Sequence, residues 1–332
     1  MLLRSASEPR PPDGARAPSP LVRRAAPWLG LVLSLLGCEG RETNFGPQAP
    51  CPTGDCEAPA SKTGLRIAAF NVHRLFDTTC DSGACGGSAY EALPTPDAFG
   101  TQADKLASAI SRLEADVVLL GEVETQASLD ALTTRLPEFR HAVLGETGAP
   151  ASVDVAVLSA HPILLTRGHR DQPLTKPDGS TTRFSRELLE VHLDTPGTRT
   201  IVFSAHFRSK VDDDPGRRFA EAEASRVIVT RTAQEWPGAL VVLGGDLNDV
   251  PGSPPLVAME QDGALLRVAS DRPDSETWTY SYFGNLQAID HLYLARGGGT
   301  YVPGSFRAAR ESRGGYGGSD HAAVYADFLP AE

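Results

Sequence analysis

The chain has 332 residues and carries 42 acidic against 31 basic side chains, for a formal net charge of −11, with 41% hydrophobic and 22% charged residues. This composition is typical of globular proteins and excludes collagen-like, coiled-coil and wholly disordered classes. An acidic total also argues against nucleic-acid binding through bulk electrostatics, although it leaves a local, metal-assisted phosphate site open.

The first 37 residues have the pattern of an export signal. Arg23 and Arg24 precede an apolar run of about 13 residues, which is too short for a membrane-spanning helix and typical of a signal peptide. Leu35-Leu36-Gly37-Cys38 resembles the lipobox of bacterial lipoproteins. We therefore expect 1–37 to be a lipoprotein signal peptide and Cys38 to anchor an exported protein to the bacterial cell membrane, facing the periplasm or the exterior. Ordinary signal cleavage beside a chance cysteine is the alternative.

The other four cysteines form two close pairs, Cys51 with Cys56 and Cys80 with Cys85. In an oxidising compartment an even number of cysteines indicates disulfides, and we expect the two local pairings, although the sequence does not exclude the others. Zinc is the alternative, but the spacing is loose for zinc and neither loop holds a histidine. Residues 38–63 have few large apolar side chains, which predicts a disordered tether.

From residue 64 onward, short apolar runs alternate with turn residues and helical patterns. The runs have the length and composition of strands, and their imperfect alternation indicates strands covered on both faces. The helix predicted at 215–235 opens with Asp214 as N-cap and Pro215 at its first position. We predict an α/β domain over 64–332 with two β-sheets in its core and helices outside. The predicted strands are 65–72, 116–123, 153–159, 188–193, 200–207, 239–246, 289–295 and 322–328, and the other predicted helices are 105–115 and 127–136.

Polar side chains stand at the ends of most of these strands. Groups at one edge of a sheet converge, so we expect them to line a single cleft. Each has an ordinary explanation when taken alone, as a turn former, a polar loop or a solvated histidine, but their joint occurrence indicates a site. They are Asn71, Glu122, His206, Asp246 with Asn248, Asp290 with His291, and Asp320 with His321.

The order of these residues resembles the endonuclease/exonuclease/phosphatase superfamily, which includes deoxyribonuclease I, apurinic endonucleases, inositol polyphosphate phosphatases and bacterial sphingomyelinases. The resemblance runs from about residue 65 to 328, and it implies the four-layer, two-sheet fold of deoxyribonuclease I and metal-dependent hydrolysis of phosphoric esters. The motifs are LRIAAFNV with Asn71, DVVLLGEVE with Glu122, VDVAVLSAHPI, RFSRELLEVHL with Arg186, FSAHFRSK with His206, LVVLGGDLND with Asp246 and Asn248, IDHLYLA with Asp290, and GSDHAAVYADF with Ser319, Asp320 and His321.

The resemblance also implies a cofactor and its ligands. A hard divalent cation held by oxygen ligands stabilises the negative charge of a phosphoester transition state, so Mg²⁺ is the expected ion, with Mn²⁺ as a substitute. Glu122 is the leading metal ligand, with Asp320 and Asn71 near it.

The remaining motif residues are expected to act on substrate and water. Asp246 would orient or deprotonate the attacking water, and Asn248 would donate a hydrogen bond to a phosphate oxygen. His321, held by Asp290, is expected to be an imidazolium that faces the phosphate. Which of Asp246 and His321 is the general base stays open. His206 would contact the phosphate or protonate the leaving oxygen, and Arg186 and Asn71 would contact the substrate.

Two positions depart from the family pattern. Deoxyribonuclease I has a glutamate that orients the histidine corresponding to His206, whereas the matching stretch here offers only Asp154, so either Asp154 serves or His206 lacks that support. Gly121 stands where relatives often carry glutamine, which indicates either extra space beside Glu122 or ordinary slack at a strand end.

Other charged residues have competing interpretations. A cationic group after His206 is either a basic lip for a phosphodiester backbone or ordinary surface charge. Three consecutive aspartates are interpreted as a helix-capping run, not as a calcium loop. Three further histidines are interpreted as structural or solvent-facing. The cationic group is Arg208, Lys210, Arg217 and Arg218. The aspartates are Asp212, Asp213 and Asp214, and the histidines are His73, His161 and His192.

Three functions remain in competition. The favoured one is an exported Mg²⁺-dependent nuclease acting on DNA or RNA, because LRIAAFNV and FSRELLEVHL match a secreted deoxyribonuclease and HFRSK is cationic. A phosphatase or phospholipase C type hydrolase of small phosphoesters or lipid head groups would suit an acidic, lipid-anchored chain. A non-catalytic surface binding module is disfavoured because no catalytic position is lost. Nothing in the sequence indicates an oligomer, so we expect a monomer.

Overall fold

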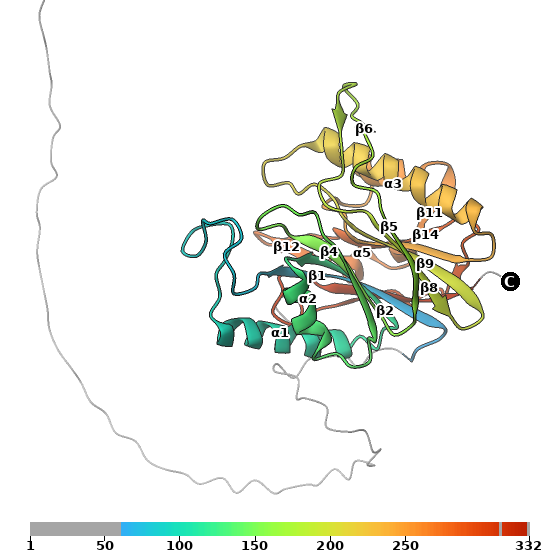
Figure 1. Cartoon of the computed structure of the whole chain (residues 1–332). Helices are drawn as coiled ribbons and strands as arrows, with labels where there is room; N and C mark the ends of the chain where they lie inside the picture. The colour runs from blue at the N-terminus through green and yellow to red at the C-terminus, as the bar shows by residue number, and fades with distance from the viewer. Residues whose placement is uncertain (1–60, 312–313, 331–332) are drawn as a thin grey trace, which may run out of the picture. The chain divides into compact units, whose positions relative to one another are not determined.

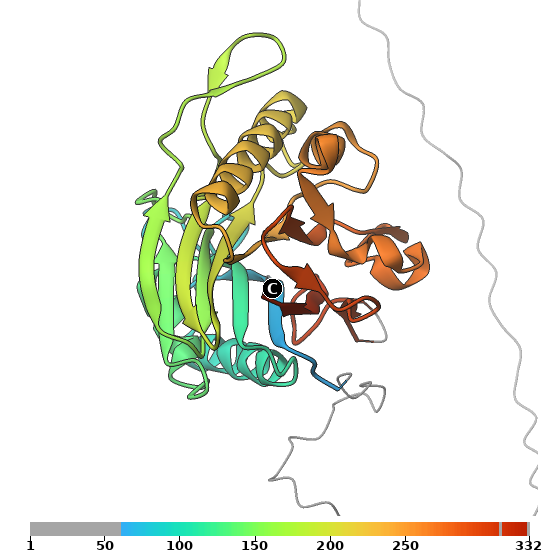
Figure 2. The same cartoon turned by 90° about the vertical axis from the view of Figure 1, so that its right-hand side faces the viewer.

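The computed structural model describes residues 61–311 and 314–330, which form two β-sheets packed face to face (Figures 1 and 2). The predicted signal peptide, Cys38, the Cys51/Cys56 pair and most of the predicted tether lie outside the described residues. Lys62 and Thr63, the last two residues of the predicted tether, bond to Asp116 and Asp327 and so contact the domain. In this part of the chain, no helix has both the length and the apolar character needed to cross a bilayer.

The first sheet is centred on β1 (Leu65–Leu75). This strand pairs in parallel with β2 (Val117–Val123) and antiparallel with β17 (Ala323–Leu329). The strand order is β15-β17-β1-β2-β4-β3, and β16 also pairs with β17. The outer strands are β3 (His141–Gly145), β4 (Asp154–Ser159), β15 (Thr300–Tyr301) and β16 (Arg307–Ala309).

The second sheet is centred on β10 (Leu240–Asp246). This strand pairs in parallel with β9 (Thr198–His206) and antiparallel with β14 (Asp290–Ala295), in the order β11-β14-β10-β9-β8-β5. The other strands are β5 (Ile163–Gly168), β8 (Leu189–Thr195) and β11 (Leu265–Arg267). Two short hairpins stand apart from both sheets, β6 (Leu174–Thr175) with β7 (Thr181–Thr182) and β12 (Tyr280–Tyr282) with β13 (Asn285–Gln287).

Helices cover the outer face of each sheet. α1 (Pro96–Ser111) and α2 (Gln126–Thr133) pack on the first sheet, and α3 (Pro215–Glu235) and α4 (Pro254–Glu260) pack on the second (Figures 1 and 2). Along each strand, residues alternate between the layer that separates the two sheets and the layer under the helices. Ile67 faces the opposite sheet, while Ala68 packs beneath the helices. The predicted four-layer fold is confirmed, and burial on both faces explains the imperfect alternation in the sequence. The shorter helices are Gln261–Gly263, Val268–Asp271 and α5 (Asp274–Thr277).

All eight predicted strands and all three predicted helices are present; α3 has the predicted bounds, and the other elements have shifted ends. α1 begins at Pro96, well before the predicted 105, because Thr95 caps it and accepts a hydrogen bond from the Ala98 N–H. Asp214 caps α3 as predicted, accepting from the Arg217 N–H. Strand β5 was missed because it is an edge strand whose side chains are mostly exposed, so it has little apolar pattern.

A buried polar cluster lies outside the predicted cleft, around Glu190 on β8. Its carboxylate bonds to Nε2 of His169 at 2.7 Å and to Nε2 of His192 at 2.6 Å, and Arg167 pairs with it. His192 is therefore structural, as predicted. Burial by itself raises the pKa of Glu190, but the two histidine hydrogen bonds and the charge of Arg167 outweigh it and lower the pKa to about 2.

This cluster gives a pH-dependent stability. An unfolded glutamate has a pKa of about 4.3. Since the folded pKa lies below this value, the contribution of Glu190 is complete above about pH 4.3 and is lost as the pH falls towards about 2. Glu190→Gln should lower the free energy of unfolding by about 1–3 kcal/mol near neutral pH, and the difference from wild type should shrink below about pH 4.

Urea denaturation followed by circular dichroism at several pH values measures this difference. Glu235→Gln, a matched charge change on the exposed surface of α3, should have little effect. A deficit for Glu190→Gln that stays constant from neutral to acid pH would contradict the assignment.

Candidate active site

The register of three neighbouring strands places polar side chains next to one another. Asp246, the last residue of β10, lies opposite His206 of β9 and opposite Asp290 of β14. Gly245 makes this approach possible: it has a φ of +142°, and a Cβ there would lie 1.9 Å from the Ala205 carbonyl oxygen. Asp290 begins its strand, whereas His206 and Asp246 end theirs, because β14 runs antiparallel to β10. Asp290 therefore stands at the first residue of its strand, and Asp320 and His321 come just before β17, so these groups lie at the beginnings of strands and not at their carboxyl ends.

Asp246 is the centre of this edge. Its Oδ2 lies 3.1 Å from Nδ2 of Asn71, 3.7 Å from Nε2 of His206 and 4.0 Å from Nε2 of His321. Its Oδ1 accepts a hydrogen bond from the Asn248 N–H at 2.9 Å. Asn71 belongs to the first sheet and Asp246 to the second, so the site closes across the gap between the two sheets.

Electrostatics give the three buried groups different protonation behaviour. Burial, followed by the negative charge of Asp290, raises the pKa of Asp246 to about 7. Burial by itself lowers the pKa of His321, but the charge and hydrogen bond of Asp290 outweigh it and raise the pKa to about 10. Burial, followed by the charges of Arg186 and His321, holds the pKa of His206 well below its usual value. At neutral pH His321 is a cation and His206 is neutral.

His321 is held on several sides. Nδ1 bonds to Oδ2 of Asp290 at 2.9 Å, and its backbone N–H donates to Oγ of Ser319, which in turn donates to the Asn71 carbonyl. The Tyr280 ring lies 4.9 Å from the imidazole. Oγ1 of Thr279 accepts the Asp290 N–H. Neither Tyr280 nor Thr279 belongs to a sequence motif, and no spacing signal would have found them.

Glu122 and Asp320 lie on the open side of the site. Oε1 of Glu122 accepts from Nδ2 of Asn71 at 3.3 Å, and Oε2 accepts from the Arg74 N–H at 2.9 Å. The carboxylate of Asp320 contacts Nδ1 of His73, the residue before Arg74, so both acids contact the same two-residue segment. His73, interpreted as structural or solvent-facing, is exposed, and its ring also contacts a predicted site residue.

Backbone bulges shape this segment. The β1–β2 register shifts between Asn71 and Leu75, and the β2–β4 register shifts at Glu122. His73, Arg74, Glu122 and Asn248 all have positive φ, which is unfavourable for residues with a Cβ and is found where surrounding structure enforces it, commonly at functional sites.

His206 lacks a carboxylate partner like the one expected from deoxyribonuclease I. Asp154 accepts hydrogen bonds from Ser152 Oγ and the Thr147 N–H instead, and within the described chain Nδ1 of His206 has no hydrogen-bond partner. A Cβ at Gly121 would lie 3.8 Å from this nitrogen, so the absence of a side chain at Gly121 leaves space beside His206. The structure therefore favours the second alternative for His206, in which Asp154 does not orient the imidazole.

Arg186 and Asn248 meet at one carbonyl. Nη1 of Arg186 and Nδ2 of Asn248 both donate to the Phe207 oxygen, at 3.4 and 3.1 Å. Glu221 on α3 is buried and accepts from the Ser185 N–H and the Arg208 N–H, both at 2.6 Å, so it fixes the backbone on either side of these groups. Arg218 is buried and paired with Asp213 and Asp249, which removes it from the proposed basic lip.

Comparison with known proteins agrees with this geometry. A family model described as "Endonuclease/Exonuclease/phosphatase family" matches residues 68–321. The chain belongs to the endonuclease/exonuclease/phosphatase family. It is therefore a phosphoester hydrolase of the metal-dependent class. No curated protein matches the sequence significantly.

Solved structures share the fold of this family member at low sequence identity. TDP2 from D. rerio complexed with single strand DNA product is 16% identical with a TM-score of 0.56, over 80% of this chain and 98% of that one. An endonuclease/exonuclease/phosphatase from Bacteroides vulgatus is 16% identical with a TM-score of 0.56, over 81% and 100%. Beta toxin 275-280 from Staphylococcus aureus is 18% identical with a TM-score of 0.53, over 79% and 99%.

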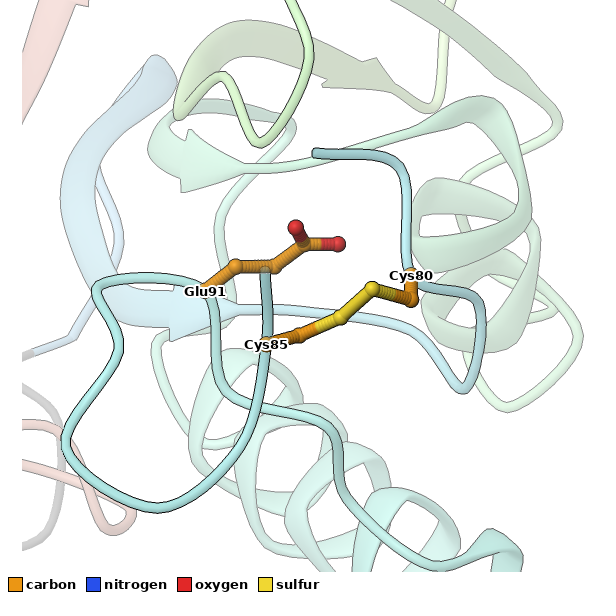
Figure 3. Close-up of side chains that lie close together, drawn as sticks. All are labelled: Cys80, Cys85 and Glu91. Carbon is orange, nitrogen blue, oxygen red and sulfur yellow. A yellow bond between two sulfur atoms is a disulfide. The ribbon is translucent and has the colours of Figure 1, made fainter. Parts of the chain in front are cut away.

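Enzymes of this family use divalent metal ions, and this chain offers two groups of three ligand-type side chains among its described residues. Asp246, Asp290 and His321 form one, but His321 and Asp290 already bond to each other. Cys80, Cys85 and Glu91 form the other, but the cysteines are joined in a disulfide, as predicted, so they cannot bind zinc (Figure 3).

The predicted ligands Glu122 and Asp320 suit a hard cation better. Their side chains are 19% and 44% exposed, so a hydrated ion has access to carboxylate oxygens there. Asn71 turns its amide nitrogen towards Glu122 and Asp246, and its oxygen accepts from the His73 N–H. As placed, Asn71 bridges two carboxylates, and its role as a ligand stays a prediction.

Glu221 was not found by sequence reasoning and can be tested directly. Glu221→Gln removes one of the two acceptors for the Ser185 and Arg208 amides, so it should cost about 1–3 kcal/mol of stability and lower turnover of a phosphodiester substrate. Thermal melting and initial rates measure both. Glu223→Gln, an exposed change on the same helix, is the control, and equal behaviour of the two variants would refute the anchoring role.

Proposed function

We propose that this protein is an exported nuclease that hydrolyses phosphodiester bonds of DNA or RNA by attack of water. The observation that carries the catalytic part is the position of Asp246, whose Oδ2 lies within 4.0 Å of Asn71, His206 and His321. A buried carboxylate with a pKa of about 7 is suited to accept a proton from water at neutral pH.

The residues around Asp246 supply positive charge and hydrogen-bond donors for the phosphate. His321, held as a cation by Asp290, places positive charge beside the position where phosphate charge develops. The second N–H of the Asn248 amide is left to bind a phosphate oxygen, since the first bonds to the Phe207 carbonyl. Arg186, on the same carbonyl, supplies a further cation. His206, neutral and partly unpartnered, is placed to contact the phosphate or the leaving oxygen.

We assign Mg²⁺ as the ion, with Glu122 and Asp320 as the residues that would hold it. When bound, such an ion neutralises phosphate charge and lowers the pKa of water. The Asn71 and Arg74 N–H groups keep the Glu122 carboxylate fixed for this task.

A nucleic-acid substrate is supported by the cations at the edge of the site. Arg74, Arg186 and Arg208 follow or flank the catalytic side chains, and such groups neutralise a phosphate backbone locally even on an acidic chain. The D. rerio TDP2 structure of the same fold holds a single strand DNA product.

One observation favours a second candidate, hydrolysis of a lipid phosphoester. The β12–β13 hairpin begins at Tyr280, which contacts His321, and exposes Tyr282, Phe283 and Leu286; Phe283 is 88% exposed. An exposed apolar loop beside a catalytic group suits a lipid surface.

The proposal is tested by incubating the protein with Mg²⁺ and plasmid DNA, ribosomal RNA, sphingomyelin vesicles or a chromogenic phosphodiester. Cleavage of nucleic acid that is abolished by chelation is expected. Asp246→Asn should lower kcat by about 10²–10⁴-fold because it removes the proton acceptor. Asp178→Asn, in the exposed β6–β7 loop, is the matched control. Activity confined to vesicles would replace the nuclease by the second candidate.

Export with a lipid anchor is a separate proposal, supported by the Leu35–Cys38 motif and by the disulfide between Cys80 and Cys85, which is typical of oxidising compartments. Metabolic labelling with a fatty acid should mark the wild type and not Cys38→Ser. Equal labelling of both proteins, or labelling of neither, would refute the anchor.

A further inference from the structure

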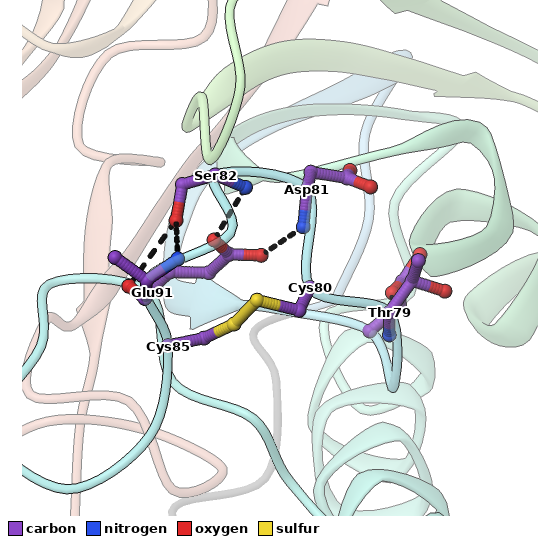
Figure 4. Close-up of a disulfide and its surroundings, with 8 residues drawn as sticks. Thr79, Cys80, Asp81, Ser82, Cys85 and Glu91 are labelled. Atoms are coloured by element: carbon purple, nitrogen blue, oxygen red, sulfur yellow. Dashed lines mark hydrogen bonds between the residues drawn. A yellow bond between two sulfur atoms is a disulfide. The ribbon is translucent and has the colours of Figure 1, made fainter.

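The loop between β1 and α1 is closed in two ways. The Cys80–Cys85 disulfide joins its first part, and the buried Glu91 carboxylate accepts the N–H groups of Asp81 at 2.6 Å and Ser82 at 2.9 Å (Figure 4). The Glu91 carbonyl also accepts the Gly86 N–H. A disulfide that closes so short a loop constrains the unfolded chain less than one that closes a long loop. Its main effect is therefore local, on the position of Glu91 and its neighbours.

The residue next to Glu91 is Tyr90, and the loop holds it at the edge of the site. Its ring packs edge-on against Phe76, with ring centroids 5.9 Å apart, and the Arg74 guanidinium lies over the ring at 4.7 Å. Arg74 is the residue whose backbone N–H donates to Glu122. Tyr90 is nevertheless 51% exposed, so packing accounts for only part of its ring.

Charges link Tyr90 to both sides of the cleft. The charge of Arg186, whose guanidinium bonds to the Phe207 carbonyl on the second sheet's side of the site, acts on its hydroxyl. Burial, followed by the charge of Glu122, raises the pKa of Tyr90, whereas Arg186 and Arg74 lower it. The ring thus lies against one cation suited to phosphate, Arg74, and within electrostatic range of Arg186 and of the predicted metal ligand Glu122.

We propose that Tyr90 is a substrate-contacting residue that stacks on the nucleotide base flanking the scissile phosphate, and that the Cys80–Cys85 disulfide holds it there through Glu91. Aromatic rings beside a phosphate-binding groove bind bases of any sequence, because every base has a π-face. This inference rests on the proposed nuclease function and names the part of the substrate that the catalytic residues do not touch.

The test compares two single-stranded DNA oligonucleotides of equal length, one with bases and one built from abasic sites. Tyr90→Ala should raise KM for the base-containing strand about five- to 150-fold, with kcat within about twofold and KM for the abasic strand unchanged. Tyr90→Phe keeps the ring and should stay close to wild type. Leu93→Ala, in the same loop at a residue that is 47% exposed, should change neither KM.

The disulfide is tested with the double variant C80S/C85S. Its KM for the base-containing strand should rise, by less than in Tyr90→Ala, while thermal melting shows that the protein is folded and kcat is retained. An unchanged KM would overturn the positioning role of the disulfide. If Tyr90→Ala affects both strands equally or neither, the stacking role is wrong and the nuclease stands. If wild type cleaves neither strand but cuts plasmid DNA or ribosomal RNA, the stacking role is wrong and the nuclease stands; if it cuts no nucleic acid, both proposals fail.

Discussion

The register of β10 against its two neighbours is the constraint on which the site depends. Asp246 lies opposite His206 on one side and Asp290 on the other, so three groups from distant parts of the chain meet without any loop having to place them. The close approach of β9 requires Gly245, since any Cβ there would overlap the Ala205 carbonyl. A side chain at this position would push β9 and β10 apart and separate Asp246 from His206.

The site is electrostatically unfavourable, and the core around it compensates. Two buried carboxylates, Asp246 and Asp290, repel each other, and this repulsion helps to raise the pKa of Asp246. His321 lies between them as a cation, and Asn71 adds a hydrogen bond from the other sheet. The bulges at His73, Arg74 and Glu122 add backbone strain at the same edge. Apolar layers above, between and below the two sheets hold these groups in place.

Sequence reasoning succeeded where a residue's role follows from its place on a strand. Asp246 and His206 could be predicted to meet because the parallel strands β9 and β10 end at one edge, and Asp290 was predicted as the partner of His321 from the family motif. It failed where position depends on loops. His73 showed no motif, yet it contacts Asp320, and Tyr280 comes from a hairpin outside both sheets. Arg218 was interpreted as part of a basic lip or as surface charge, but α3 turns it inward to pair with Asp249.

The sequence by itself determined the four layers, the family and the set of polar groups at one edge, because strand periodicity, helix caps and motif order are local properties of the chain. Only the tertiary structure decided which of these groups touch. It left His206 without the support of Asp154, turned the Asn71 amide towards two carboxylates, and brought Tyr90 beneath the Arg74 guanidinium. Side-chain direction and loop course depend on the packing of residues far apart in the sequence, and no local pattern encodes that packing.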